Sequence, residues 1–157
     1  MKIYHVVIIA LFFSSGCTVT PAKKMTPLEI QSMQSRSFEE GKNIVFTSVV
    51  SVFQDLGYTI TNADIDTGLI SAESSTSSSA AMRLLIGVSS TTQTRATAFI
   101  ERIGSQTNAR LNFVSINKTS SGYGQSDRKD TPILKAEIYQ TAFEKIDSAI
   151  FVRTSSQ

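Results

Sequence analysis

The chain has 157 residues, with 15 basic and 13 acidic side chains and a net charge of +2. This length supports a single domain with a core of its own, and the charges are dispersed rather than gathered into the basic face that nucleic acid binding requires. The only histidine, His5, and the only cysteine, Cys17, both lie near the N-terminus. The rest of the chain therefore excludes serine–histidine and cysteine–histidine catalytic pairs, zinc sites built on these residues, and internal disulfides.

The first 17 residues have the pattern of an export signal. Lys2 precedes an apolar run from Val6 to Phe13, and the small residues Ser14 to Gly16 lead to Cys17. The run is short for a membrane span and is typical of a secretory signal. This segment resembles the lipobox of bacterial lipoproteins, which implies removal of residues 1–16 and attachment of diacylglycerol to Cys17. The alternative is a buried or anchoring helix that leaves an ordinary thiol.

The sorting rule of that lipoprotein class concerns the residue after the cysteine, here Thr18. Because Thr18 is not the aspartate that typically retains such proteins in the inner membrane, the resemblance implies the outer membrane. We expect the periplasmic face rather than the cell surface. Residues 17–34 are polar and hold two of the three prolines, so they are predicted to form a flexible linker. A single domain is predicted over residues 35–157.

The first helix is predicted from Ser37 to Leu56. Ser37 is a candidate N-cap, and Val45, Val49 and Phe53 recur at helical spacing, while Gly57 follows the helix as a C′ glycine would. Two strands of a hairpin are predicted next, Tyr58–Asn62 and Leu69–Glu73.

The segment between these two strands contains Asp64, Asp66 and Gly68. The two aspartates suggest a calcium loop or a carboxylate pair, but the twelfth position of such a loop is Ser75, which is not acidic. Aspartates before a glycine are what a tight turn requires, so we interpret them as turn residues.

Serine and threonine clusters flank an apolar stretch, Met82 to Val88, within the segment from Ser74 to Thr94. One interpretation is an extra strand or short helix that caps the core. The other is a loop that docks onto a partner or a membrane. In the second case the contact residues are expected to be Met82, Leu84, Leu85 and Ile86.

The second half of the chain predicts another hairpin, a loop and a long helix. Strands are expected at Thr94–Ile103 and Ala109–Lys118, because both are rich in β-branched residues. Thr119–Asp130 is predicted to be a polar loop. Pro132–Arg153 is predicted to be a helix with Thr131 as its N-cap and a continuous apolar stripe.

Together these elements predict an α+β fold: a two-layer sandwich in which an antiparallel sheet of about four strands carries two helices on one face. Two stretches resemble a family of uncharacterised bacterial outer-membrane lipoproteins. Ser35–Tyr58 with Asp66–Ala72 is similar to its "LQDxGF…D…LGLI" pattern, and Ile138–Phe151 is similar to its "YQEFFDKLSxSVFL" ending. More loosely, the order of elements resembles the repeated domain of BamC, an outer-membrane assembly lipoprotein.

We expect a lipid-anchored, non-catalytic binding or scaffold domain of a cell-envelope assembly, with a protein partner, no nucleic acid, no metal and no cofactor. Two alternatives stay open: a surface lipoprotein that acts in immunity or exclusion, and a small-ligand-binding protein. An enzyme would have to use a serine–lysine pair or two carboxylates about 5 to 9.5 Å apart. Its candidate acids are Asp64, Asp66, Glu73 and Glu101.

Overall fold

The structure is a computed structural model that describes residues 25–78, 89–121 and 126–155. Within these ranges the chain is α+β, as predicted, with three helices and a seven-stranded antiparallel sheet. Both numbers exceed the predicted two helices and about four strands. In chain order the elements are α2 (Pro27–Gln34), β1 (Ser35–Phe38), α3 (Lys42–Asp55), β2 (Tyr58–Asp64), β3 (Leu69–Ser74), β4 (Ser77–Ser78), β5 (Ser89–Ile103), β6 (Gln106–Ser120), β7 (Ser126–Pro132) and α5 (Ala136–Ser155).

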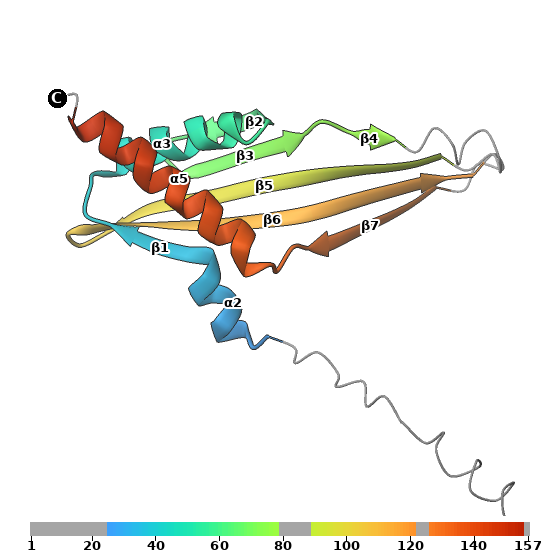
Figure 1. The fold of residues 1–157 in the computed structure, drawn as a ribbon, viewed down its shortest axis with the longest axis horizontal. Coiled ribbons are helices and arrows are strands. Elements are labelled where there is room, and N and C mark those ends of the chain that lie inside the picture. The colour runs from blue at the N-terminus through green and yellow to red at the C-terminus, as the bar shows by residue number, and fades with distance from the viewer. Residues whose placement is uncertain (1–24, 79–88, 122–125, 156–157) are drawn as a thin grey trace, which may run out of the picture.

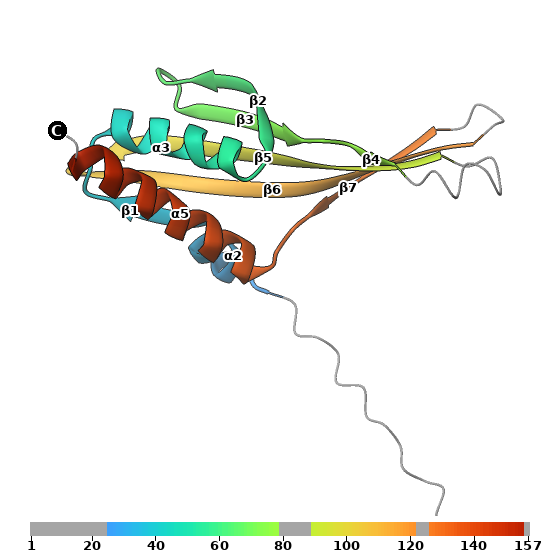
Figure 2. The ribbon, with the colours of Figure 1, turned by 45° about the horizontal axis from the view of Figure 1, so that its top comes forward.

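A long hairpin of β5 and β6 is the centre of the sheet. The two strands pair along their whole length, from Ser89 opposite Ser120 to Ile103 opposite Gln106. The strand order is β1-β6-β5-β3-β2, and β4 and β7 pair with the far ends of β5 and β6. Both α3 and α5 lie on one face of the sheet and cover only one end of it (Figures 1 and 2). The other end, which we call the β-arm (Ser89–Thr94, Ser115–Ser120, β4 and β7), extends beyond the helices.

The core lies between the helices and the sheet. The predicted apolar stripe of α3 is confirmed, since Val45, Val49 and Phe53 are all fully buried. From α5, Phe143, Ile146 and other residues of its stripe are buried against the same core. We call this covered face the inner face and the opposite one the outer face.

Residues 35–38 do not form the start of the first helix. Ser37, the predicted N-cap, instead lies in β1 and pairs with Asn108 of β6. Phe38 points into the core, with 6% of its surface exposed. The helix begins only after Gly41, which is its N-cap. Pairing with a strand about seventy residues away thus overrides the local capping signal.

The predicted linker is wrong in its second half. Thr26 and Glu29 form a capping box, in which the Thr26 side chain accepts from the Glu29 amide and the Glu29 carboxylate accepts from the Thr26 amide. Pro27 occupies the first helical position, where its missing N–H is not needed. Gln34, at the end of this helix, is buried. The folded part of the chain therefore begins at least eight residues earlier than predicted.

The predicted loop from Thr119 to Asp130 is also largely strand. β6 continues to Ser120, and β7 begins at Ser126 and pairs back along β6. Thr131 and Pro132 belong to β7, so the last helix starts at Ala136 rather than at Pro132. Pro132 is tolerated there because β7 is an edge strand.

Candidate functional site

An apolar surface depression lies where α3 ends beside the first turns of α5. We call it the interhelix groove; its volume is about 350 Å³. That is within the range of about 300 to 1,000 Å³ typical of small-ligand sites. It is lined by Leu56, Tyr58, Phe113, Glu137, Ile138, Thr141 and Ala142.

Aromatic rings form the floor of the interhelix groove. The rings of Phe53, Tyr58 and Phe113 contact one another at centroid distances of 6.0 to 6.3 Å. Ala72 on β3 is the register partner of Ala96 on β5, and Ala96 is the partner of Phe113 on β6. The two alanine side chains are small and leave space beside Phe113 for the other rings. The rings therefore fill space above the two alanines and give the groove an apolar base.

Tyr58 brings a polar group to this base. Its ring is partly buried, and burial raises the pKa of its hydroxyl group. No hydrogen bond joins this hydroxyl to another described residue, which distinguishes Tyr58 from Tyr139. A bound group could therefore use the Tyr58 hydroxyl without displacing an internal partner.

One acidic side chain lines the interhelix groove, and a second acid is next to a lining residue in the sequence; we call these two the rim. Glu137 lines the groove from the first turn of α5, and Asp55 is the last residue of α3, directly before Leu56. An acidic residue at a helix C-terminus lies near the negative end of the helix dipole, which costs about 0.3 to 1 kcal/mol. α3 has no basic residue in its last turn to offset this. Neither acid forms an ion pair with a described residue.

A buried hydrogen-bond network holds the elements around the groove in place. The Tyr139 hydroxyl donates to the Ile133 carbonyl at 2.9 Å and accepts longer bonds of 3.4 Å from the Phe113 amide and the Gln34 side chain. This single side chain therefore joins α2, β6 and the start of α5. The positions of Phe113 and of the α5 wall are fixed relative to each other as a result.

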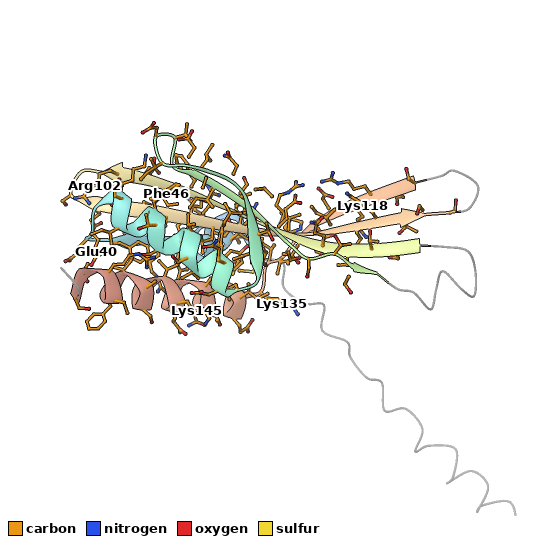
Figure 3. All side chains as sticks on the ribbon, turned by 90° about the horizontal axis from the view of Figure 1, so that it is seen from above. Glu40, Phe46, Arg102, Lys118, Lys135 and Lys145 are labelled. Carbon is orange, nitrogen blue, oxygen red and sulfur yellow. The ribbon has the colours of Figure 1, made fainter. Side chains whose placement is uncertain are left out.

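The opposite end of the covered sheet is closed by a second polar contact. Thr107 is fully buried and donates to the Glu40 carbonyl at 2.6 Å. Arg102 donates to the same carbonyl at 2.9 Å, and Figure 3 shows Arg102 and Glu40 at this end of the domain. This contact fixes the chain between β1 and α3 on the β5–β6 hairpin.

Two of the four candidate acids, Asp64 and Asp66, lie together in the β2–β3 turn. Asp64 accepts hydrogen bonds from the amides of Asp66 and Thr67, so the turn interpretation is confirmed. Hydrogen bonding from Thr67 is the main cause that lowers the pKa of Asp64. Lys42 donates to the Asp66 carbonyl at 3.0 Å and holds the same turn against α3.

Of the other two acids, Glu101 follows Ile100, whose amide donates to Gly68 of this turn, so only Glu73 lies at the other end of the β2–β3 hairpin. Glu73 is at the far end of the β2–β3 hairpin from Asp64 and binds Arg95 through two bonds of 2.9 and 3.0 Å. Glu101 lies on β5 opposite Asn108. Within the described ranges, no group of three or more histidine, cysteine, aspartate or glutamate side chains is placed to hold a metal ion.

The residues singled out as the lipidation site and the partner contact, Cys17 and the set Met82, Leu84, Leu85 and Ile86, lie outside the described residues. The strands that flank the second set are described. β4 ends at Ser78 and β5 begins at Ser89, both at the far end of the β-arm (Figure 1).

Sequence reasoning missed the interhelix groove, because Leu56 and Ile138 have the spacing of ordinary core residues. The one available signal was Asp55, an acid at a helix end where the dipole disfavours it.

None of the helices that the structure describes is long and apolar enough to cross a membrane. Comparison with known proteins gives no match, either to a protein-family model or to a curated protein.

Proposed function

We propose that this chain is a lipid-anchored, non-catalytic binding module of the bacterial cell envelope, and that the interhelix groove holds a segment of a partner protein. The observation that carries the proposal is an apolar groove with an aromatic floor and an unpaired acidic rim. The candidate catalytic acids lie outside this groove, Asp64, Asp66 and Glu101 near the β2–β3 turn and Glu73 at the other end of that hairpin.

The charge of the rim defines the chemistry of the occupant. Asp55, Glu137 and the C-terminal end of α3 all contribute negative potential, and no basic side chain lines the groove. A lipid phosphate or a fatty-acid carboxylate would be repelled. A polypeptide segment that presents a large apolar side chain beside a lysine or arginine fits both the floor and the rim.

The anchor places this groove close to a membrane. Nine peptide steps separate Cys17 from Thr26, where α2 begins. At about 3.3 to 3.6 Å per step, a lipid on Cys17 would hold α2 within about 32 Å of the bilayer. α2 is in turn joined to the domain through Gln34 and Tyr139. The expected partner is therefore another protein of the outer membrane or its periplasmic surface.

The test is chemical crosslinking of the native lipoprotein in membranes, with Thr141→Trp as the groove-filling variant. Thr141 is exposed on the groove wall, so the larger side chain fills the groove without entering the core. Ser148→Trp is the matched control, because Ser148 is exposed two turns further along the same side of α5.

We expect one defined envelope protein to be crosslinked to the wild type and to the Ser148→Trp variant, and to be lost from Thr141→Trp and from Glu137→Lys. Cys17→Ala should reduce the yield by releasing the domain from the membrane. If Thr141→Trp captures the same partner as the wild type, the groove is not the binding site.

A further inference from the structure

The outer face of the sheet carries an apolar patch in a position where a solvent-facing sheet is ordinarily polar. Leu69 and Phe99 are register partners on β3 and β5, and 48% and 39% of their surfaces are exposed. Ile103 follows on β5 with 59% exposed, and Ile65, in the β2–β3 turn, has 37% exposed. We call these four residues the outer patch.

Two charged side chains stand beside the outer patch without partners. Arg110 lies directly opposite Phe99 on β6, and Glu101 lies two residues further along β5 than Phe99. Both point to the outer face, because the alternate residues Ala98 and Ile100 are buried on the inner face. Neither Glu101 nor Arg110 forms a hydrogen bond or an ion pair with a described residue.

Some other surface charges form ion pairs: Arg36 binds Asp147 at 2.5 Å, and Arg128 binds Asp130 at 2.8 Å. Beside Phe99, an acid lies along the strand and a base lies across the strands. Such an arrangement can be complementary to a second copy of itself.

The ladder geometry shows how two copies would meet. Glu101 is about 6.7 Å from Phe99 along the strand, and Arg110 is about 4.8 Å from Phe99 across the strands. Consider two copies whose outer faces meet, related by a two-fold axis that lies between the sheets, passes over Phe99 and makes about 45° with the strands. This axis turns the direction along the strands of one copy into the direction across the strands of the other. It brings Glu101 of each copy over Arg110 of the other and crosses the strands at about 90°, as in orthogonal sheet packing.

We infer that the chain forms a homodimer through this outer face, with Phe99 at the two-fold axis and two reciprocal Glu101–Arg110 contacts. The inference does not rest on the interhelix groove, which lies on the inner face and stays open in such a dimer. A foreign partner would not need an acid and a base that can pair with each other across a two-fold axis. A second copy uses this feature, because in an isologous interface the same surface contacts itself.

The experiment is sedimentation velocity of the full chain in a detergent matched to the solvent density. The variants are Glu101→Arg and Arg110→Glu, each alone and mixed in equal amounts. Glu144→Arg, at an exposed position on α5, is the control for charge reversal. Circular dichroism checks that every variant keeps its fold.

Each single reversal makes both reciprocal contacts repulsive, so we expect the dissociation constant of the dimer to rise about tenfold or more. In the mixture, two arginines on one chain face two glutamates on the other, and dimers should return. The Glu144→Arg control should dimerise like the wild type. A wild type that sediments as a monomer, or a dimer that neither reversal weakens, overturns the inference.

Discussion

Gly68 closes the β2–β3 turn at a point where the main chain leaves no room for a side chain. Its φ is +78°, a conformation that favours glycine. A Cβ atom built on it would lie 2.0 Å from the carbonyl oxygen of Ile100. Its own carbonyl accepts a hydrogen bond of 2.8 Å from the Ile100 amide. The turn and the central strand β5 are therefore joined through this glycine.

We expect Gly68→Ala to destabilise the fold by about 2 to 5 kcal/mol. The positive φ costs about 1 to 2 kcal/mol for a residue with a Cβ atom. The clash is with main chain, which cannot rotate away, so the strands must separate by about 1 Å and weaken the bond to Ile100. Leaving that amide unsatisfied adds about 1 to 3 kcal/mol.

The matched control is Gly57→Ala. Gly57 has almost the same φ, +82°, but a Cβ atom there would meet nothing within 4 Å. Gly57→Ala should lower the free energy of unfolding only by the conformational cost of a positive φ, about 1 to 2 kcal/mol. Urea unfolding followed by circular dichroism compares the two variants at unchanged m-value. Equal losses at the two glycines would refute the steric argument for Gly68.

Three further changes test the contacts around the groove and the turn. Tyr139→Phe removes the hydroxyl that serves Gln34, and should cost about 1 to 3 kcal/mol and speed hydrogen exchange in α2; unchanged exchange there would contradict its role. Thr107→Val removes one of the two hydrogen bonds that the Glu40 carbonyl accepts and should lower the free energy of unfolding by about 0.5 to 1.5 kcal/mol in the same urea assay. Hydrogen bonds from Thr67 lower the pKa of Asp64, so its stabilisation is present above the unfolded-state pKa of about 3.9 and is lost as the pH falls through the lower folded-state value. The stability difference from Asp64→Asn should therefore shrink in acid, and a constant difference would contradict this.

The local patterns that were predicted correctly need few distant contacts. Val45, Val49 and Phe53 repeat at helical spacing, and any sheet that covers α3 will bury them. The turn at Asp64 is likewise set within five residues, because its carboxylate accepts from the amides two and three residues further on, those of Asp66 and Thr67. Local physics was sufficient in both cases.

The errors fall where pairing between distant residues decides the structure. Ser37 has a valid capping signal, but pairing with Asn108 makes it a strand residue. In the β-arm, threonine runs such as Thr91–Thr94 read as flexible because they are polar, although threonine has a high strand propensity. A polar run with both faces open to water has no apolar alternation to detect. The capping box at Thr26 and Glu29 was a local signal and could have been found.

The interhelix groove could not be predicted from the sequence, because it depends on how far apart two helices lie at one end. Leu56, Tyr58 and Ile138 look like core residues, and only the packing leaves them open on one side. The acid at Asp55 was visible, but a single unfavourable charge has no meaning until its neighbours in space are known. The site therefore needed tertiary structure.

Neither α3 nor α5 covers the β-arm, so contacts among its own strands must stabilise it (Figure 1). Its ion pair of Arg128 and Asp130 is exposed, and such pairs contribute only about 0 to 1 kcal/mol. Ile116 is the one apolar residue of the arm's described part with only 1% of its surface exposed. A partner that contacts the predicted residues between Ser78 and Ser89 would give this projection a role at its far end. At that end β4 stops at Ser78 and β5 starts at Ser89 (Figure 1). The predicted contact residues, Met82, Leu84, Leu85 and Ile86, lie between these two in the sequence.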